Sequence, residues 1–254
     1  MNAAPSAPYD LTIDRITPTQ RCAGRPAGYQ SWRSLLFMHW PVPIDTLRRL
    51  VPAKLELDLY DGCAYVGLVP FAMRAIRPWW CPKALGFNFL ETNVRTYVVH
   101  RGRPGVYFFS LEASSRIAVN LARSIWALPY HYARMTMHHA DAEMRYSSHR
   151  VRGGDSLSVR YRVGSSLPPS TLGSLEFFFL ERYLLFVERQ GAIFSGQVFH
   201  SPYPVQTAFV DEVDDQLIAA AGLQKVQGLP ALTHYSAGVD VEVFPLQRIS
   251  NAGE

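Results

Sequence analysis

The sequence predicts one antiparallel, β-dominated α+β domain with a few short helices. Two observations support this fold class. Short apolar segments follow one another at close spacing and are separated by Gly, Pro and Asp residues, as expected for strands joined by turns. Helical spacing of apolar residues recurs only in short, isolated windows. A hydrophobic content of 48% in 254 residues supplies enough apolar side chains for one large core.

The first half of the chain is predicted to contain an arm, a strand, a short helix and two hairpins. Residues 1–30 are rich in Pro, Ala and Gly and predict an irregular N-terminal arm. Residues 31–250 show no repeat or clear linker, and we expect them to form a single domain. The predicted elements are a strand at 32–40, a helix from Asp45 through Leu50, a hairpin of 55–60 with 64–71, and a hairpin of 92–100 with 105–113.

The second half alternates short helices with further strands. A helix is predicted over 116–127 and a break at Pro129, because proline lacks a backbone N–H and biases the preceding residue out of the helical region. The other predicted elements are strands at 132–138, 143–150 and 157–163, a helix at 171–183, strands at 184–189 and 192–200, a helix at 211–221, and a last strand at 239–246.

Composition and charge exclude several classes of protein. The arginines that give the net charge of +4 are scattered among acidic residues, so we expect no nucleic-acid partner. No uncharged apolar run approaches the roughly 20 residues that a membrane helix needs, and the N-terminus lacks the pattern of a signal peptide. We therefore predict a cytoplasmic protein with a small-molecule ligand and no membrane partner. A homo-oligomer is compatible with the sequence.

The cysteines and histidines do not form a metal-binding pattern. The three cysteines are odd in number and lack Cys-x-x-Cys spacing, which favours free thiols. The histidines lack His-x-His and His-x₃-His spacing. Four of them could still meet in three dimensions, although structural histidines are the better interpretation: His39, His131, His200 and His234. We expect no metal and no cofactor, since the chain also lacks a Gly-rich phosphate loop.

Residues 120–131, Asn-Leu-Ala-Arg-Ser-Ile-Trp-Ala-Leu-Pro-Tyr-His, present polar side chains at the proline bend. This segment resembles one in the acetoacetate decarboxylase-like superfamily, where Gly-Arg-Glu runs to Pro-Lys-Lys and the first lysine forms a Schiff base with a keto acid. Arg123 and Pro129 match that pattern, whereas Tyr130 and His131 stand at the lysine positions. The resemblance therefore implies the scaffold without Schiff-base chemistry, because the only three lysines lie in other segments.

Other segments carry the same resemblance in the same order. Arg33 falls where the decarboxylases have an active-site arginine, Glu91 falls at their active-site glutamate, and His234 lies in a segment similar to their C-terminal Ser-His. A sister family of uncharacterised bacterial proteins, a domain-of-unknown-function family, is still more similar. Its signatures correspond to residues 39–43, 93–98, 128–131, 175–183 and 200–205. The resemblance spans about 30 to 247 and implies a conical antiparallel β-barrel.

Three residues are predicted to be catalytic. Glu91 lies among apolar residues, which would raise its pKa and suit it to general acid–base work, unless it pairs with a nearby arginine. Tyr130 would hold a carbonyl or enolate oxygen, and His131 would shuttle the proton. Neighbours on an extended segment face opposite ways, and we expect Tyr130 to be the inward one.

Four polar residues are predicted to bind the substrate. Arg33 would clamp a carboxylate bidentately, since a guanidinium group matches that geometry. Asn93, Arg95 and Arg123 complete the predicted set. The segment Glu181-Arg182-Tyr183 is interpreted as an internal ion pair or a cluster that lines the barrel wall.

Two functions fit these residues. The first is an enzyme that acts on a small carbonyl or carboxylate compound by enolisation, hydration or dehydration, or carbon–carbon cleavage, without a covalent imine. The second is a non-catalytic module that holds a hydrophobic or aromatic metabolite in the barrel, for which the aromatic residues would be suited. Convergence of Glu91, Arg33 and Tyr130 on one cavity would favour the enzyme.

Overall fold

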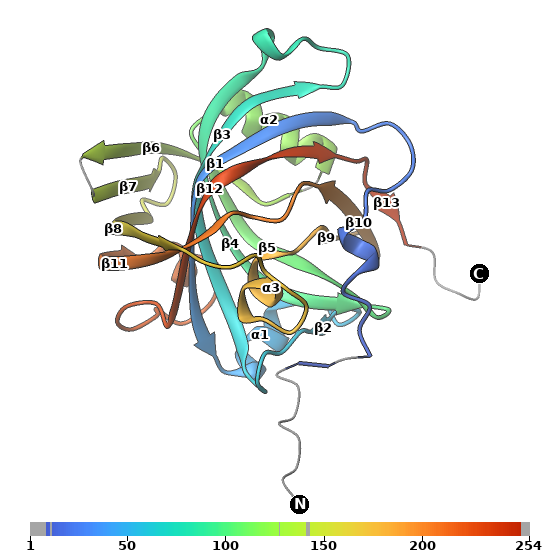
Figure 1. The fold of residues 1–254 in the computed structure, drawn as a ribbon, viewed down its shortest axis with the longest axis horizontal. Helices are drawn as coiled ribbons and strands as arrows, with labels where there is room; N and C mark the ends of the chain where they lie inside the picture. The colour runs from blue at the N-terminus through green and yellow to red at the C-terminus, as the bar shows by residue number, and fades with distance from the viewer. Residues whose placement is uncertain (1–8, 11, 127, 141–142, 250–254) are drawn as a thin grey trace, which may run out of the picture.

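In the computed structural model, which describes residues 9–10, 12–126, 128–140 and 143–249, thirteen strands join in one hydrogen-bonded sheet (Figure 1). The strands are β1 (Gly28–Val42), β2 (Glu56–Leu57), β3 (Ala64–Pro78), β4 (Phe87–His100), β5 (Arg103–Ala113), β6 (Tyr130–Ala140), β7 (Glu143–Arg150), β8 (Ser156–Ser166), β9 (Leu184–Arg189), β10 (Ala192–Phe199), β11 (Val205–Asp215), β12 (Leu232–Val243) and β13 (Gln247–Arg248). The helices are η1 (Thr17–Thr19), α1 (Ile44–Leu50), η2 (Lys83–Leu85), α2 (Arg116–Trp126), α3 (Leu175–Leu180) and α4 (Leu217–Ala220).

Seven of the strands pair around a ring, which gives the molecule its barrel. The pairings run from β1 through β3, β4, β5, β9, β10 and β12 and return to β1. Most are antiparallel, whereas β5 pairs in parallel with both β6 and β9. The β-dominated α+β class and the barrel architecture predicted from the sequence are confirmed by this arrangement.

A second layer extends from the ring and packs against its outside. Strands β6, β7, β8 and β11 continue the sheet from β5 round to β12, and Figure 1 shows them projecting to one side of the barrel. Side chains of β1, β3 and β4 that point away from the ring, such as Met38, Leu68 and Val94, form a core with Tyr146 and Tyr161 of this layer. The opposite faces of the same three strands line the barrel interior.

Two predicted elements are wrong in their pairing or type. The predicted hairpin of 55–60 with 64–71 forms only at its turn, where Tyr60 and Cys63 pair in a single bridge around Asp61-Gly62. Residues 64–71 belong to β3, but the only strand described within 55–60 is β2, which pairs with Val98 and Val99 of β4 instead. Next to β2, the Asp58 side chain turns into the barrel and meets two arginines. Strand β11 occupies the first part of the predicted helix at 211–221, up to Asp215, and its acidic residues pair with arginines of the neighbouring β8. Only α4 remains helical, and its first turn is capped by Asp215.

The other predicted elements differ mainly at their ends. The helix predicted at 171–183 is confined to α3, whose first turn is capped by the Ser174 hydroxyl. The strand predicted at 239–246 begins earlier, at Leu232. The predicted end of the α2 helix at 127 and the predicted domain end at 250 lie outside the described residues.

The N-terminal arm is joined to the barrel by a buried ion-pair network. Asp58 accepts hydrogen bonds from Arg15 at 2.7 and 2.8 Å and from Arg182 at 2.6 Å. The Arg15 guanidinium also lies 4.3 Å from the centre of the Tyr9 ring. All of these side chains are buried. The described part of the predicted irregular arm therefore forms part of the wall, with one turn of 3₁₀ helix at η1.

We expect Asp58→Ala to destabilise the fold by about 3–5 kcal/mol, because it leaves two buried guanidinium groups without their carboxylate. Denaturant unfolding measures this change. Glu242→Ala, which removes the partner of Arg21 in a more exposed pair, is the control and should cost under about 1 kcal/mol. Equal losses in the two variants would contradict the structural role of the Asp58 network.

Candidate functional site

Strand β4 directs a row of polar side chains into the barrel. The strand is paired on both sides, by β3 and β5, and its side chains alternate between the two faces. Phe89 and Tyr97 belong to the interior core, and Glu91, Asn93 and Arg95 lie at the alternating positions between them. All three polar residues are buried. The same strand thus carries an acid, an amide and a cation into an apolar interior.

A cavity of about 190 Å³ lies within the barrel beside these residues. Most of its wall is apolar and aromatic, and it includes Trp32 and Phe71 from the ring and Trp126 from α2. Its polar and charged side chains are few: Gln30, Glu91, Arg95, Tyr130, Arg182 and Tyr203. A concave, mostly apolar site with a small number of converging polar groups is the usual form of a small-molecule binding site.

Tyr130 and Glu91 form the central polar contact of this cavity. The Tyr130 hydroxyl donates a hydrogen bond of 2.7 Å to Glu91 Oε2. The position of Tyr130 follows from the proline bend, because the Pro129 carbonyl accepts a hydrogen bond from Leu111 of β5 and Tyr130 begins β6 directly beside it. The contact joins strands β4 and β6 across the edge of the barrel.

The surroundings of Glu91 favour its protonated form. Burial raises the pKa of Glu91 to about 8, and the nearby carboxylate of Glu112 acts in the same direction, while the Tyr130 hydrogen bond opposes both. Burial and the adjacent Glu91 raise the pKa of Tyr130 well above its ordinary value. Glu91 therefore carries a proton that it can donate and recover close to neutral pH.

Two arginines bring positive charge to the same cavity. Arg95 is 9% exposed, and among the described residues it makes no ion pair; its terminal nitrogen donates to the Phe179 carbonyl at 3.3 Å. Arg182 is paired with Asp58, yet its buried Nη2 has no hydrogen-bond partner within the described part of the chain. A buried guanidinium without a counter-ion is costly, and an anionic ligand would offset that cost.

Arg33 does not line this cavity, contrary to the sequence prediction that it shares one with Glu91 and Tyr130. Its side chain forms an ion pair with Asp240 near the surface. The cause is a β-bulge: Ser34 has a φ of 54°, and β1 contains an extra residue relative to β3 at this point. Before the bulge, the even-numbered residues of β1, such as Trp32, point into the barrel, and after it the odd-numbered residues, such as Leu35, do so. Arg33 lies before the bulge and therefore points away from the cavity.

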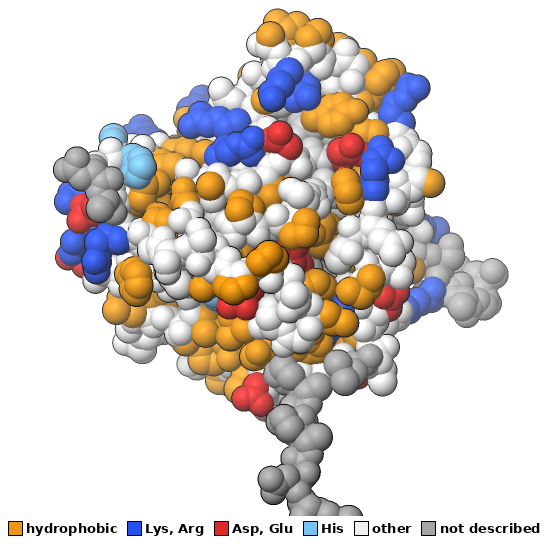
Figure 2. Space-filling view, in the orientation of Figure 1, with side chains coloured by type: hydrophobic (Ala, Val, Ile, Leu, Met, Phe, Trp, Pro, Cys, Tyr) orange, Lys and Arg blue, Asp and Glu red, His pale blue; other side chains and the backbone are white. Residues whose placement is uncertain are grey.

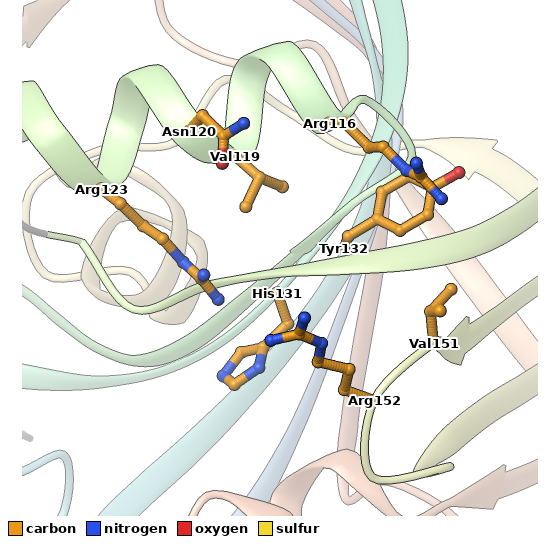
Figure 3. A pocket seen from close by; sticks show the side chains of 8 residues that line it. All are labelled: Arg116, Val119, Asn120, Arg123, His131, Tyr132, Val151 and Arg152. Carbon is orange, nitrogen blue, oxygen red and sulfur yellow. The ribbon is translucent and has the colours of Figure 1, made fainter.

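His131 and Arg123 lie on the other face of β6 from Tyr130. Both line a separate surface pocket, shown in Figure 3, and the Arg123 Nε donates to the Tyr130 carbonyl at 2.7 Å. Tyr130 is thus the inward member of the Tyr-His pair. Asn93 is buried on β4, and its Oδ1 has no hydrogen-bond partner among the described residues. The structure therefore brings together Glu91, Tyr130 and Arg95 and separates them from His131 and Arg123.

Sequence reasoning left the role of one charged residue near the site open and missed another. The segment Glu181-Arg182-Tyr183 was interpreted as an ion pair or a cluster that lines the barrel wall; Arg182 does line the cavity, and the Tyr183 hydroxyl donates to Glu181 at 2.6 Å, but the ion-pair partner of Arg182 is the distant Asp58. Glu112 is fully buried on β5 and pairs with Arg150. Glu91 was identified by the resemblance to the decarboxylases and by its apolar neighbours, and this second signal, an acidic residue within an apolar strand, is also present at Glu112.

The lysines, the candidate metal ligands and the buried His39 do not contribute to the Glu91 cavity as the structure describes it. Among the described residues, none of the three lysines lines the Glu91 cavity, and no group of three or more His, Cys, Asp or Glu side chains is arranged to hold a metal ion. His39 donates to or accepts from the Tyr97 hydroxyl at 2.6 Å. No helix in the described ranges has the length and apolar character needed to span a membrane.

The ring of strands and its interior cavity define a barrel of the acetoacetate decarboxylase-like fold. Acetoacetate decarboxylase from Legionella pneumophila superposes with a TM-score of 0.62 at 12% sequence identity, covering 92% of this chain and 93% of that one. The enduracididine biosynthesis enzyme MppR, solved with pyruvate, gives a TM-score of 0.63 at 13% identity, covering 91% and 93%. These likenesses concern the fold.

Within that fold, the chain belongs to the DUF2071 family of uncharacterized conserved proteins, which matches residues 29–240. It is 35% identical over 223 residues to the uncharacterized protein YqjF of Bacillus subtilis (strain 168). That alignment covers 87% of this chain and 92% of YqjF. The domain-of-unknown-function family inferred from the sequence signatures is confirmed.

Glu91 should make the stability of the protein depend on pH. Between the ordinary carboxyl pKa of 4.5 and about 8, the folded state retains a proton that the unfolded state releases, so stability falls as pH rises through this window. Glu91→Gln removes that dependence. We expect the variant to gain stability relative to wild type from pH 5 to pH 8, by a few kcal/mol in total at about 1.4 kcal/mol per pH unit.

Unfolding midpoints measured across this range test the expectation. Glu56→Gln, at an exposed position on β2, is the matched control and should follow wild type at every pH. A constant difference between Glu91→Gln and wild type from pH 5 to pH 8 would contradict a raised Glu91 pKa.

Proposed function

We propose that this protein is an enzyme that enolises a small compound carrying a carbonyl and a carboxylate group, with Glu91 as the acid–base residue. The observation that carries the proposal is the 2.7 Å hydrogen bond between Tyr130 and Glu91 inside an apolar cavity that also contains Arg95. A carboxyl group with a pKa of about 8 is suited to both removing and returning a proton near neutral pH.

The cations suggest how such a compound would bind. Arg95 is buried and lacks a carboxylate partner among the described residues, so it is the side chain to which a substrate carboxylate would be attracted. Arg182 also lines the cavity and would place a positive charge near the carbonyl oxygen. The volume of about 190 Å³ corresponds to roughly six water molecules at about 30 Å³ each, which restricts the substrate to a small molecule.

The reaction would proceed by transfer of one proton. In its ionised form Glu91 takes the proton from the carbon next to the carbonyl, the C–H electron pair forms the carbon–carbon double bond, and the carbonyl oxygen gains the negative charge beside Arg182. Protonated Glu91 then returns a proton to carbon. Tyr130 holds the Glu91 carboxylate in place throughout, a different role from the carbonyl contact expected from the sequence.

Schiff-base catalysis is not part of this proposal. The lining of the cavity contains no lysine among the described residues, and Tyr130 occupies the position that resembles the lysine of the decarboxylases. A covalent imine requires a deprotonated amine at the reacting carbon. The acid–base route needs only the groups that converge at Glu91.

The aromatic wall favours a second candidate function, a module that binds a metabolite without transforming it. Trp32, Phe71 and Trp126 supply large apolar surfaces around the cavity. The two functions differ in what happens to a bound compound: the enzyme exchanges its carbon-bound protons with solvent, and the binding module does not.

Arg95→Gln should abolish binding of a small keto acid, because it removes the buried positive charge that would meet the carboxylate. Saturation-transfer NMR with pyruvate measures the binding. Arg33→Gln is the matched control, since it removes an arginine of β1 that lies outside the cavity, and it should bind like wild type. Loss of binding in Arg33→Gln with retention in Arg95→Gln would reverse the assignment.

Glu91→Gln should leave pyruvate binding in place and reduce exchange of the methyl protons with D₂O by about 10²–10⁴-fold, the range expected for loss of a general base. Proton NMR of pyruvate in D₂O follows the exchange. Wild-type protein that binds pyruvate and a panel of other small keto acids without exchanging any of their protons would be a binding module.

Tyr130→Phe should shift the pH profile of exchange upward, because the Tyr130 hydrogen bond lowers the pKa of Glu91. The half-maximal rate would then appear at higher pH than in wild type, with folding retained. An unchanged profile would show that Tyr130 does not act on Glu91 during the reaction.

A further inference from the structure

A second pocket, of about 480 Å³, lies on the surface formed by α2, the start of β6 and the segment after β7 (Figure 3). It is on the opposite face of β6 from the Glu91 cavity, because Tyr130 points inward and His131 points into this pocket. Its apolar part consists of Val119, Tyr132 and Val151. The polar side chains around it come from all three segments.

Helix α2 contributes one face to this pocket. Arg116, Asn120 and Arg123 are spaced at i, i+4 and i+7, which places them along a single side of the helix. Two of the guanidinium groups are held in position: Arg123 Nε donates to the Tyr130 carbonyl at 2.7 Å, and Arg116 lies 4.8 Å from the centre of the Tyr132 ring. The Arg123 bond uses only Nε, so it does not occupy the terminal nitrogens.

A third arginine approaches from the other side. Figure 3 shows Arg152, from the segment after β7, extending toward the His131 ring, and Arg123 extending toward the same ring from α2. His131 is half-buried between them. Burial, followed by the positive charges of Arg150 and Arg123, lowers the pKa of His131 to about 4. At neutral pH the ring is therefore uncharged, with one nitrogen able to donate a hydrogen bond and the other able to accept one.

The carboxylates near the pocket form ion pairs with a fourth arginine, Arg150. Arg150 pairs with the buried Glu112 at 2.5 Å and with Asp155 at 3.3 Å. Within the described ranges, no carboxylate forms an ion pair with Arg116, Arg123 or Arg152. The pocket therefore has an excess of positive charge.

The geometry points to a binding site for the phosphate group of a phosphorylated small molecule, in which Arg123 and Arg152 flank the anion beside His131, and Arg116, at the Tyr132 end of the pocket, adds positive charge for the rest of the ligand. Guanidinium groups recognise phosphate oxygens bidentately. The pocket volume exceeds that of a phosphate ion, since it equals roughly sixteen water molecules at about 30 Å³ each. The apolar surface leaves room for the organic part of the ligand.

Titration calorimetry with inorganic phosphate and with pyrophosphate, at constant ionic strength in chloride, tests this site on the full-length chain. Wild type should bind pyrophosphate saturably and more tightly than phosphate. The double variant Arg116→Gln/Arg152→Gln should weaken binding at least about tenfold, because it removes two of the three positively charged side chains that line the pocket, including Arg152 beside His131. Both residues are exposed, so the variant should unfold at the wild-type temperature.

Arg49→Gln is the control for non-specific charge, since Arg49 is an exposed arginine on α1, outside the pocket. It should bind both anions like wild type. In parallel, the His131 imidazole signals in NMR should move on addition of pyrophosphate to wild type and remain unchanged in the double variant.

Three results would overturn the proposal: no saturable binding to wild type, equal weakening by Arg49→Gln, or an unperturbed His131. Binding of a single-stranded oligonucleotide far more tightly than pyrophosphate would assign the same arginines to nucleic acid instead of a small molecule. This test of the phosphate site is independent of the enolisation proposed for the Glu91 cavity, because none of the substituted residues lines that cavity.

Discussion

The structure depends on three strands, β1, β3 and β4, that are buried on both faces. One face supplies the barrel interior and the other supplies the core beneath the second layer of strands. The side chains of residues 91–99 on β4 are therefore removed from water whichever way they point, and any polar group there must be paired or used. Burial raises the pKa of Glu91, and Arg95 is a buried cation on the same strand. The chemistry of the cavity follows from the double burial of its wall.

Strand β6 separates two pockets, because its consecutive residues Tyr130 and His131 point to opposite faces and each lines a different one. Tyr130 meets Glu91 inside the barrel, and His131 meets arginines on the surface. The two pockets are linked through the backbone, since the Tyr130 carbonyl accepts the Arg123 hydrogen bond.

The β3–β4 connection carries a different kind of surface. Figure 2 shows hydrophobic side chains at this end of the molecule, and Trp80, which belongs to the connection, is 68% exposed.

The sequence predicted the parts of the fold and site that depend on local pattern. Glu91 and Tyr130 were found because their segments resemble active-site segments of the acetoacetate decarboxylase-like superfamily, and the apolar neighbours of Glu91 and the proline bend before Tyr130 added local support. Arg33 was misplaced because the bulge at Ser34 is set by pairing with strands far along the chain, and local pattern does not reveal a change of face. The partner of Arg182 was missed for a similar reason, since Asp58 lies 124 residues away.

The pairing of β1 with β12 has a consequence for how the protein folds. The ring closes only when residues 232–243 of β12 meet residues 28–42 of β1 on one side and β10 on the other. These strands lie far apart along the sequence, and pairings of this kind are slow to form because the entropy of closing the intervening chain is lost before the contacts stabilise it. Until β12 pairs, β1 presents an unpaired edge to solvent, which is the kind of edge that promotes aggregation. The interior cavity has a complete wall only after this pairing has formed.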